Sequence, residues 1–77
     1  MDKFKTGDHV RIVSDDLYNR LREEYKITSR VGLLVNIDIQ DGNKNNQGLV
    51  VNWVEFDGDT SELLFADEEL EKVNEYN

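Results

Sequence analysis

Residues 54–73 constrain the fold of this chain more than any other segment. They read Val-Glu-Phe-Asp-Gly-Asp-Thr-Ser-Glu-Leu-Leu-Phe-Ala-Asp-Glu-Glu-Leu-Glu-Lys-Val. Asp57-Gly58-Asp59 predicts a tight hairpin between two apolar stretches, because Asp-Gly favours such turns. The acids at 67–69 suit the start of one short helical turn, and a closing strand follows near Leu70. This succession of elements is typical of small antiparallel barrels.

The rest of the chain predicts further strands and one helix. Alternation of apolar and polar residues is the signal for a half-buried strand. The expected strands are 9–14, 31–39, 48–56, 62–66 and a closing strand that ends near Val73. Ser14-Asp15-Asp16 is a helix-start signal, and an apolar face follows it, so we expect a short helix over about 15–25. The Asn-rich stretch 40–47 is expected to be a hairpin loop.

These elements predict a mainly β fold, a small five-stranded antiparallel barrel with one short inserted helix. A chain of 77 residues is expected to form a single domain over 1–77. Gly32 predicts either a bulge or a close approach of two backbones. The expected core residues are Val10, Ile12, Leu17, Leu21, Leu33, Val35, Ile37, Val54, Phe56, Leu64, Leu70 and Val73.

Residues 4–12 form an opening strand after a Gly-Asp turn, and residues 54–73 form a V-x-F-D-G hairpin followed by D-E-E-L-E-x-V. Both segments resemble the small Src-homology-3-like barrels, especially the bacterial and phage relatives of the KOW-type module. Gly32 starts a segment similar to the glycine-led second strand of that family. The helix at 15–25 stands where the family usually has a loop, and the basic surface of its nucleic-acid-binding members is missing. The resemblance therefore implies a fold and says little about function.

Charge is divided unevenly along the chain, which carries a net charge of −8. Residues 1–30 hold 7 Lys and Arg against 6 Asp and Glu, whereas residues 31–77 hold 2 against 11. Such a field repels a phosphate backbone over most of the surface, so we expect no direct binding of nucleic acid. A protein partner with a basic surface is the better electrostatic match.

The sequence offers little for catalysis or for a cofactor. It has no cysteine and one histidine, His9, which we expect to be solvated on the outer face of the first strand. Residues 57–62 resemble the start of a calcium loop, but Glu62 stands where that loop requires glycine. We therefore expect no enzyme, no catalytic residues, no metal and no cofactor. No apolar run approaches the ~20 residues of a membrane span, so no membrane contact is expected and the cytoplasm is the default location.

One tryptophan and a set of acids are the candidate binding residues. They are Trp53, Glu55, Asp57, Asp59, Glu62, Asp67, Glu68 and Glu69. If Val54 and Phe56 point inward, Trp53 and Glu55 point outward, and an exposed Trp beside carboxylates is typical of a binding hot spot. Two other interpretations stay open: the acids are a solubilising surface, or Trp53 is buried beneath the helix at 15–25.

The leading functional hypothesis is a non-enzymatic acidic binding module, from a bacterium or phage, that engages a protein. It is expected to be a monomer or a weak homodimer, because an open barrel has an unpaired edge. One alternative is a phage-type mimic of nucleic acid that inhibits a host restriction or CRISPR nuclease. Mimicry requires carboxylates in rows near the ~7 Å spacing of phosphates. A second alternative is a weak RNA-binding barrel that uses Lys3, Lys5, Arg11, Arg20, Arg22, Lys26 and Arg30.

Overall fold

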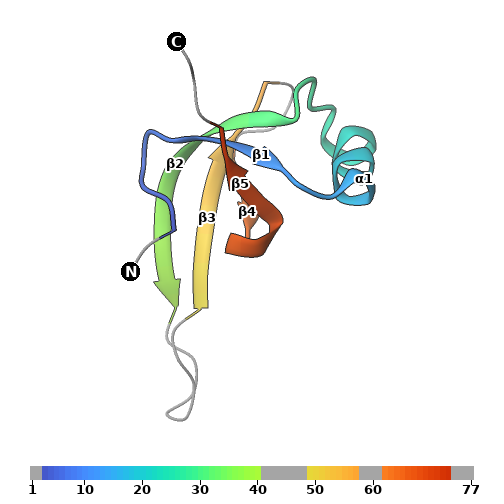
Figure 1. Cartoon of the computed structure of the whole chain (residues 1–77). Coiled ribbons are helices and arrows are strands. Elements are labelled where there is room, and N and C mark those ends of the chain that lie inside the picture. Colours follow the sequence, from blue (N-terminus) through green and yellow to red (C-terminus); the bar gives the residue numbers. More distant parts are fainter. Residues whose placement is uncertain (1–2, 41–48, 58–61, 74–77) are drawn as a thin grey trace.

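The computed structural model describes residues 3–40, 49–57 and 62–73, and Figure 1 shows their arrangement. The elements in chain order are β1 (His9–Ile12), α1 (Asp15–Tyr25), β2 (Val31–Gln40), β3 (Leu49–Glu55), β4 (Glu62–Phe65), the 3₁₀ turn η1 (Asp67–Glu69) and β5 (Leu70–Lys72). Within the described residues the five strands form one antiparallel sheet in the order β4-β3-β2-β1-β5. The prediction of a mainly β, five-stranded antiparallel fold with one helix at 15–25 is confirmed.

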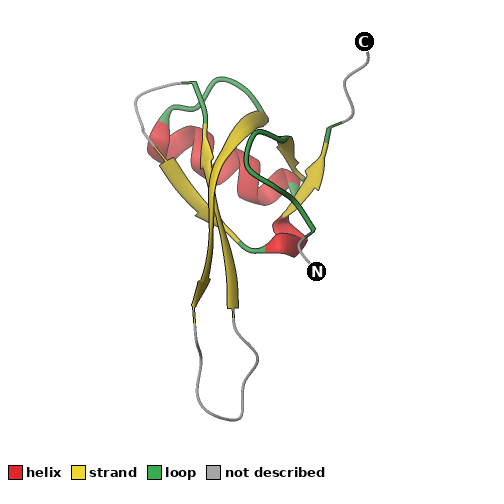
Figure 2. Cartoon of the chain, turned by 90° about the vertical axis from the view of Figure 1, so that its left-hand side faces the viewer, coloured by secondary structure: helices red, strands yellow, loops and turns green. Residues whose placement is uncertain are grey.

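Strand β2 connects the two halves of the sheet. Its first residues pair with β1, and nearly its whole length pairs with β3. In Figure 1, β1 and β5 cross in front of β2, β3 and β4, and the β2–β3 ladder extends below the rest of the sheet. Figure 2 shows α1 behind β2 and β3. The sheet therefore folds over on itself, and the core lies between its two halves and α1.

Helix α1 spans the predicted range, and its start signal at Ser14 is confirmed. The Ser14 side chain accepts a hydrogen bond from the Leu17 N–H at 3.2 Å, the usual N-cap contact. The helix ends at Lys26, which adopts a left-handed conformation and donates its N–H to the Arg22 carbonyl. Arg30 ties the helix to the preceding strand, because it donates to the Ile12 and Val13 carbonyls and pairs with Asp15.

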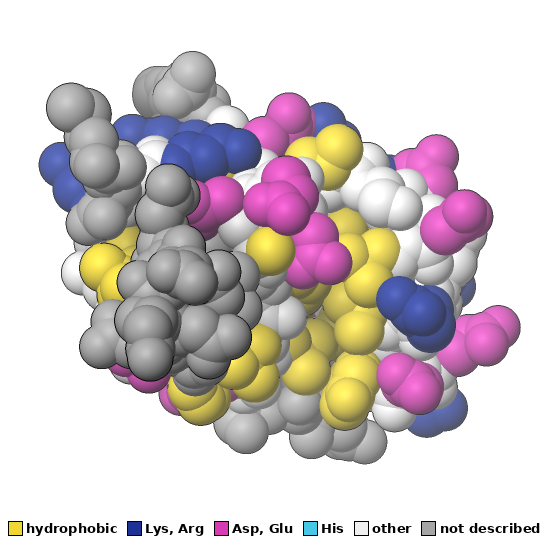
Figure 3. Space-filling model, turned by 90° about the horizontal axis from the view of Figure 1, so that it is seen from below, with side chains coloured by type: hydrophobic (Ala, Val, Ile, Leu, Met, Phe, Trp, Pro, Cys, Tyr) yellow, Lys and Arg dark blue, Asp and Glu magenta, His cyan; other side chains and the backbone are white. Residues whose placement is uncertain are grey.

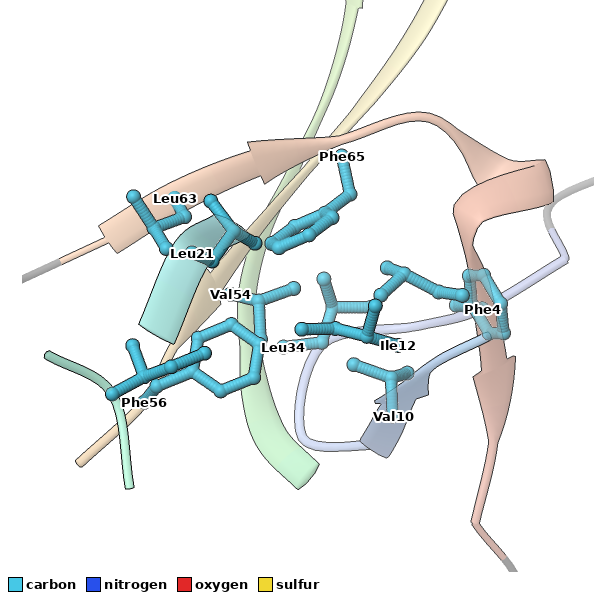
Figure 4. Packing of buried hydrophobic residues seen from close by; sticks show 11 residues of the cluster. Phe4, Val10, Ile12, Leu21, Leu34, Val54, Phe56, Leu63 and Phe65 are labelled. Atoms are coloured by element: carbon cyan, nitrogen blue, oxygen red, sulfur yellow. The ribbon is translucent and has the colours of Figure 1, made fainter. Parts of the chain in front are cut away.

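The core is one cluster of hydrophobic side chains, drawn in Figure 4. Its members are Phe4, Val10, Ile12, Leu21, Ile27, Leu34, Val54, Phe56, Leu63, Phe65 and Leu70. Six of the predicted core residues are confirmed: Val10, Ile12, Leu21, Val54, Phe56 and Leu70. Phe56 and Phe65 pack at 5.7 Å between ring centroids in a tilted arrangement. Burial of each large side chain stabilises the fold by about 1.5–3 kcal/mol.

The core prediction is wrong for Leu33 and Val35 in β2. Both are half-buried, whereas Leu34 between them is fully buried. The pairing of β2 with β3 shifts between Leu34 and Asn36, so the strand carries a β-bulge there. Because a bulge inserts one extra residue, the strict alternation used for the prediction fails at this point. Leu34 and Ile37 therefore both contact the core, Ile37 from its edge.

The core prediction is also wrong for Leu64 in β4, which is 52% exposed. Its neighbours Leu63 and Phe65 are buried instead, because they pair with Val54 and Asn52, the inward residues of β3. Asn52 is itself 1% exposed, and its Nδ2 donates to the Phe65 carbonyl at 3.2 Å. The remaining predicted core residues, Leu17 and Val73, are half-buried.

Gly32 is a site of close backbone approach, one of the two roles predicted for it. A Cβ at this position would lie 2.6 Å from Val54 Cγ1 and 2.9 Å from the Glu55 carbonyl oxygen. No larger residue fits without a shift of β3. The predicted loop at 40–47 and most of the Asp57-Gly58-Asp59 hairpin lie outside the described residues. In the described ranges, no helix has the length and apolar character needed to cross a membrane.

Candidate protein-binding surface

The strand register assigns one set of side chains to the sheet face that points away from the core. On β3, Trp53 and Glu55 alternate with the buried Asn52 and Val54. Side chains directly opposite one another on antiparallel strands share a face. The rows on this face are Leu33–Glu55–Glu62, Asn36–Trp53–Leu64 and Asp38–Val51. We call these eight side chains the outer face.

Trp53 lies at the centre of the outer face. It is half-buried and stands between Asn36 and Leu64 in the middle row. Val54 points inward, as the outward orientation of Trp53 requires. Full burial beneath α1 does not hold, since Trp53 lies outside the core cluster. Its indole Nε1 is buried and meets no acceptor among the described residues.

Two carboxylates face each other beside Trp53. Glu55 and Glu62 are directly opposite in the β3–β4 register, and both are exposed. The ion pairs among the described residues are Arg11–Glu71, Arg30–Asp15 and Lys72–Asp8, and none includes either glutamate. Like charges directly opposite on a sheet destabilise it. This row therefore places two negative charges opposite each other at a cost to the stability of the sheet.

A shallow depression of about 520 Å³ continues from the outer face toward β1. It is lined by His9, Val31, Gly32, Leu33, Glu55, Phe56 and Asp57. It brings the predicted binding residues Glu55 and Asp57 together. His9 of β1 also lines it and is exposed, as predicted. In the part of the chain that the structure describes, no three His, Asp or Glu side chains are placed to hold a metal ion.

The three acids of η1 lie apart from this set. Asp67 accepts a hydrogen bond from Asn52 Nδ2 at 2.8 Å, and Glu69 accepts one from the Ala66 N–H at 2.8 Å. Glu69 thus stabilises its own turn and Asp67 joins that turn to β3, whereas Glu68 is exposed. Asp59 lies outside the described residues. Of the predicted binding residues, the structure brings together Trp53, Glu55 and Glu62 on one face, with Asp57 beside them.

An apolar crevice between α1 and β4 was not predicted. It has a volume of about 230 Å³ and is lined by Leu17, Leu21, Tyr25, Leu63, Leu64, Phe65 and Glu69. Figure 3, which views the molecule from below, shows a band of hydrophobic side chains with acidic and basic side chains at its border. Leu64 belongs both to this crevice and to the outer face, so the two surfaces are continuous. The helical spacing of Leu17, Leu21 and Tyr25 was visible in the sequence. The crevice was missed because Leu64 of β4 was predicted to point into the core.

Comparisons of this chain with protein-family models, with curated proteins and with solved structures find no match. The resemblance to Src-homology-3-like barrels therefore stays a prediction. The described residues define the class: a small, mainly β protein of five antiparallel strands and one helix, with an apolar and acidic outer face.

Proposed function

We propose that this protein is a non-enzymatic binding module that engages another protein through its outer face. The observation that carries the proposal is the row arrangement on β3 and β4. Trp53 and Leu64 lie side by side, and the opposed carboxylates Glu55 and Glu62 border them. A large aromatic anchor with charged groups at its rim is the usual composition of a binding hot spot.

The charge of this surface supports a partner with a basic surface. Glu55 and Glu62 have no described cation, and the whole chain carries a net charge of −8. Such a field speeds the approach of a basic protein and suppresses encounters with acidic ones. A cytoplasmic setting belongs to the same proposal, in keeping with a chain that has no cysteine.

The two nucleic-acid alternatives have less support. A mimic of nucleic acid needs free carboxylates in rows, whereas Asp67 and Glu69 accept hydrogen bonds from within the protein and Glu71 pairs with Arg11. An RNA-binding surface needs free cations. Arg30 donates hydrogen bonds to two backbone carbonyls, and Lys3 donates to the carbonyls of Asp67 and Leu70.

The test is affinity capture from an extract of the cells that express the protein, followed by reconstitution with the purified candidate partner. The informative variant is Glu55→Gln with Glu62→Gln, which removes both rim charges and keeps the shape of the row. We expect the affinity for the reconstituted partner to fall about tenfold or more, and the loss to shrink at high salt.

The matched control is Asp16→Asn with Glu23→Gln, two exposed acids of α1 whose removal changes the net charge equally. A partner that binds the Glu55/Glu62 variant more weakly than the Asp16/Glu23 variant binds through the outer face. Equal loss with both pairs would mean that only the overall charge matters. Retention of every captured protein by the Glu55/Glu62 variant would refute the proposal, as would turnover of a substrate by the purified chain at a rate that this variant leaves unchanged.

A further inference from the structure

We infer that the crevice between α1 and β4 receives a bulky apolar side chain from a partner segment that also carries lysine or arginine. This inference rests on the proposed function and adds to it the chemistry of the partner. The apolar side chain enters between α1 and β4, and the flanking cations lie against the acids beside Leu64.

The crevice has two apolar walls of different origin. Leu17, Leu21 and Tyr25 recur every four residues and form one stripe of α1. Residues 63–65 of β4 form the other wall. The volume of about 230 Å³ lies below the roughly 300–1,000 Å³ typical of small-molecule pockets. The crevice therefore suits one large side chain of a protein better than a free ligand.

The distribution of exposed hydrophobic residues singles out this crevice. In the described ranges, four large hydrophobic residues are exposed: Val13 at 46%, Tyr25 at 38%, Ile39 at 59% and Leu64 at 52%. Single exposed hydrophobic residues are common on protein surfaces. Tyr25 and Leu64 are different because they line the same crevice from opposite walls. A grouped apolar surface of this kind marks an interaction site.

The charges around the crevice select its occupant. Glu69 lines it, and Glu62 stands two residues before Leu64 on the same face of β4. A second copy of this chain would bring the same acids and a net charge of −8 to the contact, so repulsion opposes self-association. A segment with a central apolar residue and flanking cations satisfies both the crevice and its rim.

The test uses randomised short peptides displayed on phage, selected against the whole protein and sequenced. Selected peptides are then measured for binding by fluorescence polarisation. We expect enrichment of peptides with a large apolar residue flanked by Lys or Arg. Leu64→Ser and Tyr25→Ser should each weaken their binding about tenfold or more. Ile39→Ser is the matched control, because Ile39 is exposed and does not line the crevice.

Several outcomes overturn the inference. The inference fails if no peptide is enriched, or if the enriched peptides lack basic residues. It also fails if the crevice variants and the control variant weaken peptide binding equally. Self-association in analytical ultracentrifugation that Leu64→Ser abolishes would identify a second copy as the occupant. If a captured partner responds to Glu55→Gln with Glu62→Gln but not to Leu64→Ser or Tyr25→Ser, the proposed function stands and this inference fails. Because the two crevice variants change different walls, loss of folding in one leaves the other informative.

Discussion

The two ends of the sheet differ in which charged residues they place opposite each other. At one end, β1 and β5 place Arg11 directly opposite Glu71, and the two side chains form an ion pair. At the other end, β3 and β4 place Glu55 directly opposite Glu62. Lys72 and Asp8 add a second cation–anion contact at the first end, at 3.8 Å. The β1–β5 end therefore follows the rule for stable cross-strand pairs, and the β3–β4 end departs from it.

The two ends also differ in how they treat apolar residues. Leu70 of β5 is 1% exposed, whereas Leu64 of β4 is 52% exposed next to the half-buried Trp53. Local departures from stabilising rules tend to occur at functional sites. β5 thus closes the fold, and the departures on β3 and β4 fit the proposal that their outer face binds a partner. The variants below test this division from the largest expected effect to the smallest.

The largest change in the free energy of unfolding is expected in β4, where Leu63 is buried and its neighbour Leu64 is exposed. Leu63→Ala empties part of the core and should lower the free energy of unfolding by about 2–5 kcal/mol. Leu64→Ala should cost less than about 1 kcal/mol, because its side chain is already exposed. Urea denaturation monitored by Trp53 fluorescence measures both values. If the two variants lose similar stability, Leu64 belongs to the core and the outer face is wrongly assigned.

The next largest loss of stability is expected at Gly32 of β2, the strand that connects the two ends of the sheet because it pairs with both β1 and β3. Gly32→Ala places a methyl group against Val54 and the Glu55 carbonyl. Overpacking of this kind should lower the free energy of unfolding by about 1–3 kcal/mol. Gly7→Ala is the comparison for backbone strain without overpacking, since its Cβ would meet no atom within 4 Å while its φ of +97° disfavours a side chain. Denaturation curves compare them. A Gly32→Ala variant as stable as the wild type would mean that the close approach of β2 and β3 relaxes freely.

The sequence predicted the order of elements well because the signals for their boundaries are local. Ser14 begins the helix through a contact with the N–H of Leu17, three residues away, and the acids 67–69 form the expected short turn. Alternation likewise placed Val54 and Phe56 of β3 in the core, whereas Trp53 was left open between an exposed position and burial beneath the helix. These predictions depend on neighbouring residues, whose geometry the backbone fixes.

The errors arose where tertiary contacts decide the outcome. The bulge after Leu34 reverses the faces of β2, and no glycine or proline at 34–36 announces it. In β4, three successive apolar residues hid the alternation, so the inward pair was assigned to the wrong positions. The buried amide of Asn52 was missed because a polar residue is usually placed at the surface. The candidate site was affected in the same way: the crevice requires Leu64 to be exposed, which only the β3–β4 register reveals.

A smaller effect is expected when the charge pattern of the β1–β5 end is made to match the other end. Arg11→Glu places like charges opposite each other at Glu71 and should lower the free energy of unfolding by about 1 kcal/mol. Denaturation in low salt measures the loss. The double variant Arg11→Glu with Glu71→Arg restores an opposite-charge pair in reverse order. If it recovers no stability, the pair contributes through packing of the side-chain stems and not through charge.

The smallest effect is expected from the reverse change at the β3–β4 end. Glu62→Lys converts the opposed carboxylates into an opposite-charge pair with Glu55 and should raise the free energy of unfolding by about 0.2–1 kcal/mol. The gain should shrink in high salt, because both groups are exposed. Glu68→Lys is the control, since it changes the net charge equally at an exposed position on η1. The same Glu62→Lys variant should bind a basic partner more weakly than the control does. Greater stability together with weaker binding would show that the opposed carboxylates serve recognition at a cost to the fold, whereas unchanged binding would leave them without a role there.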